Sequence, residues 1–384
     1  MDTGTAHLVF PKAWSSRLGN LDLIREIDCE TANQDLVKGE ICGPVEIKIE
    51  GFDPIYSEIL FLNLIKIIYT LLKACENTHQ RQISSNGDKF KEVFHSQLHS
   101  IFQIHHPKAL ARLGAKRAEV LIDYANTHFH IQTGMDDFSI QYDPAQLPNP
   151  SSLIYLPARE FLSIFEGFIK AYNKRELPFD GTYYDLALAL NAQPGHDNKL
   201  GDVQPAIELL QKAIVGNNWD KKEILKQDNG RFYFDLPEGY FDIHSVADGY
   251  RKLGTLLYLL RNGSLTKDSI LFWDEPEARL NPKLSVEVAR VLPMLAKAGM
   301  QIFLATHDFA LGYELSLLAE YPPANPIDIK FFSLYKPDRQ STLIVESGST
   351  LADIDHNSIL DEFATQHDRE TDLFYNGRGL NDTD

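Results

Sequence analysis

The hydrophobic pattern of this 384-residue chain is most regular in its C-terminal half. Two short apolar runs, "ILFW" (270–273) and "QIFLA" (301–305), predict strands, and the stretch 282–298 between them predicts a helix that ends at Gly299. A further helix and a third strand, "DIKFFSLYK" (328–336), follow. Strands joined by single helices require right-handed crossovers, so we expect these three strands in one parallel sheet flanked by helices.

The rest of the chain shows weaker patterns. The spacing of apolar residues and the turn residues predict, in the N-terminal part, a strand entering a turn at 44–55, a buried helix at 57–75, a polar helical segment at 76–118 and a hairpin at 118–143. A buried strand ending at Pro157 is predicted next, followed by mainly helices over 160–215 with a break at 191–202. A short strand is then predicted at 229–237, and a helix that follows the turn 245–253 and is closed by Asn262 and Gly263. The acidic tail after Leu373 is expected to fray.

Composition indicates a soluble globular protein, with 43% hydrophobic and 24% charged residues. The longest apolar run, 58–72, is interrupted by Asn63 and Lys66, so we expect no membrane span. The N-terminus lacks the layout of a secretory signal, and the three cysteines have no CxxC spacing, which favours neither a disulfide framework nor a zinc site. We therefore expect a cytoplasmic protein.

The net charge of −17 disfavours nucleic-acid binding across the whole surface. One locally basic run, "HHPKALARLGAKR" (105–117), leaves local nucleic-acid contact open, but a solvated helix face is the favoured interpretation of such a run. Charge therefore does not indicate a nucleic-acid partner.

Polar residues follow two of the predicted parallel strands. Asp274 and Glu275 come directly after "ILFW", and His307 comes two residues after "QIFLA". The carboxyl ends of parallel strands meet at one edge of a sheet, so an acidic pair and a histidine are expected to converge there. Phosphoryl transfer from a nucleotide is the simplest chemistry for this set: Asp274 holds magnesium through water, Glu275 polarises the attacking water and His307 contacts the departing γ-phosphate. The alternative is a buried strand that ends at a polar turn, beside a core histidine.

Three segments in a fixed order make the pattern specific. "SVADGYRKLGTLLYLL", "ILFWDEPEARLNP" and "QIFLATHD" together resemble the head of ABC-type ATPases, in particular the soluble bacterial AAA-labelled branch related to SMC and RecF. The resemblance covers about residues 150–365. It implies a P-loop NTPase-like α/β fold, with a mainly parallel sheet flanked by helices and a helical insertion. It also implies that Asp274 binds Mg²⁺ in a Walker B strand, that Glu275 is catalytic and that His307 is the switch histidine.

The same resemblance implies a nucleotide-binding role for two further motifs. "VADGYRK" matches the signature motif, whose helix N-terminus clamps the γ-phosphate bound by the other subunit, since a helix N-terminus favours an anion. "EARLNP" matches the D-loop at the dimer seam. Ala247 stands where the signature usually has serine, which removes one hydroxyl contact. The residues implied to contact nucleotide are Ala247, Asp248, Gly249, Arg251, Lys252 and Asn281.

The resemblance also implies a domain organisation, cofactors and partners. We expect an N-terminal part of the ATPase lobe at 1–75, an insertion at 76–150, the ATPase core at 151–345 and a tail at 346–384. ATP and Mg²⁺ are the implied cofactors. The implied partners are a second copy of the chain or a related ATPase, together with a separate effector protein in anti-phage defence or DNA maintenance.

The phosphate-binding loop of such ATPases, G-x-x-x-x-G-K-[ST], is missing from the sequence, which contains no Gly-Lys dipeptide at all. If Gly51 is forced into the first position, then Tyr56, Ser57 and Glu58 stand where Gly, Lys and Ser/Thr belong. Three explanations stay open: a degenerate subunit, a subunit that donates its signature helix to an intact partner, or a sequence that lacks a short segment near residues 56–61. The alternative function is therefore a pseudo-ATPase scaffold that binds a partner without binding ATP in cis.

Overall fold

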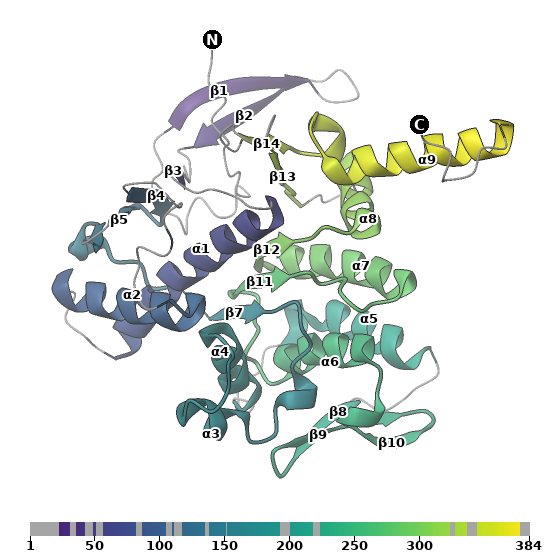
Figure 1. The fold of residues 1–384 in the computed structure, drawn as a ribbon, viewed down its shortest axis with the longest axis horizontal. Helices are drawn as coiled ribbons and strands as arrows, with labels where there is room; N and C mark the ends of the chain where they lie inside the picture. The colour runs from purple at the N-terminus through teal and green to yellow at the C-terminus, as the bar shows by residue number, and fades with distance from the viewer. Residues whose placement is uncertain are drawn as a thin grey trace.

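A computed structural model describes residues 23–376, apart from 31–35, 43–48, 51–56, 82–86, 105–109, 111–116, 135–137, 151, 193–199, 218–222, 323–326 and 336–343. A parallel sheet lies near its centre (Figure 1), with strand order β12 (Gln301–Ala305), β11 (Ile270–Asp274) and β7 (Leu153–Leu156). Helices pack on both faces of this sheet. The predicted α/β class with a parallel sheet flanked by helices is confirmed.

The central strand divides the interior into two cores. Successive residues of a strand point to opposite faces, so alternate residues of β11 separate. Leu271 and Trp273 pack into one core, together with residues of α6 (Asp248–Arg261) and α7 (Pro282–Ala298). Ile270 and Phe272 pack into the other, together with α1 (Ser57–Gln80). All five residues of β11 are buried, as is usual for a central parallel strand.

The helices lie largely where the sequence predicts them. Helix α7 has the predicted bounds, because Asn281 caps its first turn and Gly299 ends it in the left-handed region at φ +119°. The remaining helices of at least six residues in the described part of the chain are α2 (Gly87–Phe102), α3 (Phe168–Asn173), α4 (Gly181–Leu190), α5 (Gln204–Val215), α8 (Phe309–Glu320) and α9 (Ser358–Asn376).

Antiparallel strands form the margins of the molecule. The predicted hairpin is confirmed as β4 (Arg117–Tyr124), β5 (Thr127–Gly134) and β6 (Phe138–Gln141), with β3 (Ile49–Glu50) paired to β4. A second sheet contains the predicted strand β9 (Arg231–Leu236) between β8 (Leu225–Asp228) and β10 (Gly239–Asp242), and β1 (Leu23–Glu30) pairs with β2 (Leu36–Cys42).

The third strand of the parallel sheet is not the one predicted. β13 (Phe331–Tyr335) pairs antiparallel with β14 (Ile344–Gly348), and β7 takes the place beside β11. The side of β11 opposite to β12 is occupied by β7, whose four residues are all buried. β13 instead forms its backbone hydrogen bonds with the strand that follows it in the chain, as neighbouring antiparallel strands commonly do.

The C-terminal helix α9 extends away from the body of the molecule (Figure 1). It continues to Asn376, beyond Leu373, where fraying was expected, and 377–384 lie outside the described residues. Most of the basic run 105–117 and of the strand-and-turn segment 44–55 also lies outside them. Within the described ranges, no helix has both the length and the apolar character needed to cross a membrane.

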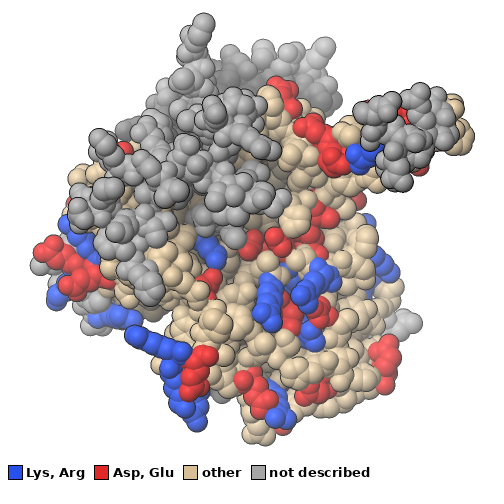
Figure 2. Space-filling model, in the orientation of Figure 1, with Lys and Arg blue, Asp and Glu red and all other residues tan. Residues whose placement is uncertain are grey.

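Acidic and basic side chains are interspersed on the face of the molecule drawn in Figure 2. The coloured part of that face shows no broad basic surface.

Candidate functional site

The carboxyl ends of β11 and β12 lie side by side. The two strands pair in parallel, with Asp274 opposite Ala305, the last residue of β12. The next residue on the β11 side, Glu275, donates its backbone N–H to the carbonyl oxygen of Ala305 at 2.8 Å. Residues that follow the two strands are therefore brought to one edge of the sheet, as the sequence predicts.

His307 faces two carboxylates at this edge. Its Nδ1 lies 3.6 Å from Oε1 of Glu275 and 3.8 Å from Oε1 of Glu277. Its backbone N–H donates to Glu277 Oε1 at 3.3 Å. The imidazole is half-exposed, with 50% of its side chain accessible, so His307 is not a core histidine.

Asp274 is buried at this edge, with 8% of its surface exposed. Burial raises the pKa of its carboxyl to about 6, and the negative charge of Glu275 adds to the effect, while Lys66 and Lys252 oppose it. A carboxylate in this position is costly unless a cation joins it, which agrees with the chemistry expected of the acidic pair.

Glu277 belongs to the same cluster, although the sequence analysis does not single it out. It is 8% exposed, and burial raises the pKa of its carboxyl, partly offset by hydrogen bonds from its own backbone, Thr306 and His307. Its second oxygen, Oε2, is buried with no hydrogen-bond partner in the described structure. The only signal for it in the sequence is the repeat of an acidic residue directly after Pro276.

The segment Glu275–Asn281, here called the 275–281 turn, connects β11 to α7. Glu275 has a φ of +43° and Arg279 a φ of +64°, the left-handed region that non-glycine residues adopt at a cost of about 1–3 kcal/mol. Asn281 ends the turn, and its side chain accepts a hydrogen bond from the Leu284 N–H at 3.0 Å. This residue, implied by the resemblance to lie at the nucleotide, is thus also the N-cap of α7.

The first turn of α6 packs against the 275–281 turn. A Cβ added to Gly249 would lie 3.2 Å from Leu280 Cδ2 and 3.3 Å from the carbonyl oxygen of Arg279. Asp248 forms ion pairs with Arg251 and Arg279, and its hydrogen bond from Arg279 lowers the pKa of its carboxyl. A side chain at position 249 would therefore crowd the 275–281 turn.

Ala247 is the N-cap of α6 and offers no side-chain cap to the first amides. Arg251, buried at 9% exposure, donates through Nη1 to the carbonyl oxygens of Ile243 (3.2 Å) and Val246 (2.9 Å). Its Nη2 pairs with Glu160 at 3.1 Å, as well as with Asp248. Arg251 therefore ties the start of α6 to the segment before it and to the loop after β7.

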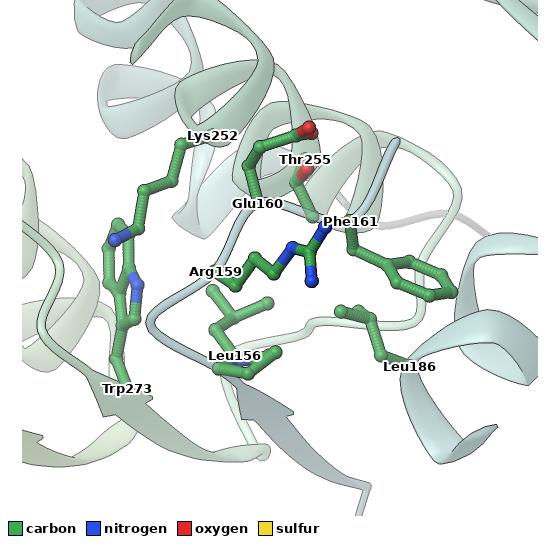
Figure 3. Close-up of a pocket in the computed structure, with 9 residues that line it drawn as sticks. Leu156, Arg159, Glu160, Phe161, Leu186, Lys252, Thr255 and Trp273 are labelled. Carbon is green, nitrogen blue, oxygen red and sulfur yellow. The ribbon is translucent and has the colours of Figure 1, made fainter. Parts of the chain in front are cut away.

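Lys252 is buried, with 5% of its surface exposed. Its Nζ donates to three carbonyl oxygens, those of Ala158 (3.0 Å), Glu275 and Ala278 (3.4 Å). Burial lowers the pKa of its ammonium to about 8, although the carboxylates nearby oppose the shift. Figure 3 shows the Lys252 side chain beside the Trp273 indole, at the wall of a small pocket that Arg159 and Glu160 also line.

The donor set fits a divalent cation with oxygen ligands. Asp274 is a buried carboxylate with a raised pKa, Glu275 adjoins it, and Glu277 has one unpartnered oxygen nearby. Within the described residues there is no group of three or more His, Cys, Asp or Glu side chains already arranged to hold a metal. Mg²⁺ commonly uses one or two protein carboxylates together with water and phosphate oxygens, and Asp274 with Glu275 could supply those carboxylates.

A known family matches this part of the chain. Residues 138–311 match the model of the AAA_21 family, described as "AAA domain, putative AbiEii toxin, Type IV TA system". The match includes the first turn of α6, the 275–281 turn and His307. Residues 138–311 are therefore similar to AAA_21 domains, which agrees with the P-loop ATPase head that the sequence resembles. No curated protein matches the chain closely enough to count as a relative.

Solved structures that are similar to this chain include two SMC heads and an ABC protein. The SMC head domain from Thermotoga maritima is 10% identical and covers 61% of this chain and 75% of its own, with a TM-score of 0.32. An SmcHead bound to the C-winged helix domain of ScpA is 13% identical over 80% of this chain and 93% of its own, with a TM-score of 0.40. CbiO1 from Clostridium perfringens, part of the ABC transporter complex cbiONQ, is 16% identical over 62% and 73%, with a TM-score of 0.27.

The position expected for a phosphate-binding loop, residues 51–58, lies mostly outside the described residues.

Proposed function

We propose that this chain binds ATP with Mg²⁺ and hydrolyses it at the edge formed by Asp274, Glu275 and His307. The observation that carries the proposal is the 3.6 Å approach of His307 Nδ1 to Glu275 Oε1 from two neighbouring parallel strands. The match of residues 138–311 to an ATPase family supports the same chemistry.

Each residue has a task that suits its surroundings. Asp274, helped by the carboxylates beside it, would hold the Mg²⁺ ion, which supplies charge neutralisation to the phosphates. Glu275 is the more accessible of the pair, with 39% of its side chain exposed, and it accepts a proton from the attacking water. His307 donates a hydrogen bond to an oxygen of the γ-phosphate, where negative charge develops.

We further propose that nucleotide gates a dimer. The first turn of α6 has no side chain capping its amides at Ala247, so these amides suit the γ-phosphate held by a second subunit, either another copy of the chain or a related ATPase. Hydrolysis would open the pair and convert bond cleavage into motion. The family description, which names a toxin–antitoxin system, supports a role in anti-phage defence or DNA maintenance with a separate effector.

One experiment tests hydrolysis directly. The full chain is incubated with ATP and Mg²⁺, and phosphate release is compared between wild type and Glu275→Gln. We expect wild-type turnover and a loss of at least about 100-fold in the variant, the usual contribution of a general base. Phosphate release that is equal in both proteins contradicts the proposal.

A second candidate function rests on the absence of any Gly-Lys dipeptide in the sequence. A scaffold that dimerises or binds a partner without turnover would not need a phosphate-binding loop. Equilibrium binding separates the two candidates: an ATPase gains about 2.7 kcal/mol of stability at a ligand concentration 100 times its Kd, whereas a scaffold shows no Mg²⁺-dependent thermal shift with ATP.

A further inference from the structure

The backbone of Glu275 is fixed from two directions. On one side its N–H donates to the carbonyl oxygen of Ala305, at the end of the neighbouring strand. On the other side its own carbonyl oxygen accepts from the Ala278 N–H at 3.0 Å and from the Nζ of Lys252. Between these contacts Glu275 has a φ of +43°, a conformation that persists in a non-glycine residue only when its surroundings impose it.

Among these partners of Glu275, Ala305 and Ala278 contribute backbone groups, whereas Lys252 contributes a side chain and lies on a helix, α6. From α6 its side chain donates to two carbonyl oxygens of the 275–281 turn, those of Glu275 and Ala278, and to that of Ala158 in the loop after β7. An ammonium has three N–H donors, and these three carbonyl oxygens use all of them.

We propose that Lys252 is a positioning residue for Glu275: by binding the Glu275 carbonyl it holds the turn in the left-handed conformation that aims the carboxylate at His307. The effect that we expect on the rate of ATP hydrolysis rests on the proposed ATPase function, whereas the effect on the conformation of the turn does not. The positioning role differs from the role that the resemblance implies for Lys252, because a buried ammonium whose donors are all used by carbonyls has none left for a phosphate.

The alternative for Lys252 is that it only fills space beside Trp273. Two observations favour positioning. The accepting groups are carbonyls of the turn itself rather than carboxylates. The two neighbouring contacts between α6 and the turn, at Gly249 and Asp248, already hold the elements together, so packing alone does not require a cation there.

The kinetic test compares the full chain with Lys252→Met, which keeps length and apolar volume but removes all three donors. We expect kcat to fall at least tenfold while KM for ATP changes less than threefold. A control, Lys174→Met, removes an exposed lysine paired with Glu176 and should leave both constants unchanged. A rise in KM with kcat retained would overturn the proposal in favour of direct nucleotide contact, and no change in either constant would also overturn it.

A second test needs no ATPase activity, so its outcome is independent of the proposed function. Glu275→Gly and Glu275→Ala both lack the carboxylate, and they differ in the ease with which residue 275 adopts a positive φ. They also differ in the entropy of the unfolded chain, but that contribution is the same in both backgrounds. We expect the glycine variant to have the higher urea midpoint of unfolding in the wild-type background. In the Lys252→Met background the turn can relax, so this difference should shrink or reverse.

An equal difference in both backgrounds would overturn the proposal whether or not the chain hydrolyses ATP. If Lys252→Met does not fold, the same pair of Glu275 substitutions is measured with Lys252→Arg. A guanidinium keeps the charge but is planar and cannot direct its donors to the same three carbonyls. The difference should then be smaller than in wild type, and an unchanged difference would again overturn the proposal.

Discussion

The Glu275 carboxylate and the His307 imidazole approach to 3.6 Å across two parallel strands that pair directly in the sheet. Neither side chain lies in the hydrophobic core, since 39% of the first and 50% of the second are exposed. Both can therefore reach a ligand at the sheet edge. The pair also makes separate predictions possible for each of its members.

Substitution of Glu275 by glutamine should separate nucleotide binding from hydrolysis. The amide keeps size and polarity but cannot accept the proton from water, so ATP should stay bound and the dimer should stay closed. We expect a shift from monomer to dimer in ATP and Mg²⁺, measured by light scattering coupled to size exclusion. The matched control is Glu287→Gln on α7, where an exposed arginine is the ion-pair partner. An ATP-independent oligomeric state in Glu275→Gln would contradict nucleotide gating.

The buried carboxyl of Asp274 should make stability depend on pH in a defined direction. Its pKa is about 6 in the folded chain and 3.8 ordinarily, so the folded state takes up the proton first as the pH falls. Stability should therefore rise as the pH is lowered from about 7 towards 4 in the absence of metal, by at most about 3 kcal/mol from this group.

Asp274→Asn removes this titration. At pH 8 in EDTA we expect the variant to be more stable than wild type, because an uncompensated buried charge has been removed. The difference should diminish at pH 5, where wild-type Asp274 is itself largely protonated. Urea unfolding at both pH values measures this. Equal stability of the two proteins at pH 8 would show that the carboxylate is already compensated.

Gly249 and Gly312 offer a matched pair of helical glycines. An alanine Cβ at Gly249 would crowd a leucine methyl group and a backbone oxygen of the 275–281 turn, whereas at Gly312 the nearest atom, 3.6 Å away, is in ordinary contact. We expect Gly249→Ala to lower the free energy of unfolding by about 1–3 kcal/mol through overpacking. Gly312→Ala should raise it by about 0.5–1 kcal/mol through helix propensity. Chemical denaturation measures both, and the same sign for both would contradict the packing described here.

Substitutions of Trp273 should show how much its side chain contributes to the stability of the core between the sheet and α6. Its side chain is fully buried, and its indole N–H has no hydrogen-bond partner among the described residues. Trp273→Phe therefore loses volume but no hydrogen bond, and we expect a smaller loss of stability than the roughly 3–5 kcal/mol expected for Trp273→Ala. Thermal unfolding of the two variants tests this order. A phenylalanine variant as unstable as the alanine variant would indicate a hydrogen bond that the structure does not show.

Local signals explain which parts of the fold could be predicted from the sequence. Helix α7 is marked at both ends, by Asn281 and Pro282 at the start and by Gly299 at the end, so its bounds follow from capping chemistry. The sequence predicts that Asp274, Glu275 and His307 lie close together, because they follow two apolar runs that are joined by a single predicted helix.

Long-range pairing explains what the sequence does not reveal. β7 is recognisable as a buried strand, but its place beside β11 depends on the pairing of Leu153 with Ile270, which no local pattern encodes. In the sequence Glu277 resembles any acidic turn residue, and only the fold shows that its carboxylate accepts a hydrogen bond from the His307 backbone N–H. No local pattern around Lys252 indicates that it is buried, because the three carbonyl oxygens that accept its hydrogen bonds come from distant parts of the chain.

The strand β11 serves two cores at once, with Leu271 and Trp273 facing α6 and α7, and Ile270 and Phe272 facing α1. Insertion of one residue within this strand would exchange the two sets, because side chains alternate strictly along it. The indole would then be driven into the tyrosine-lined space beside α1, and the carboxylate would move away from the sheet edge. A change of length in this strand would therefore disturb both cores and, with them, the sheet edge where Asp274 and Glu275 lie.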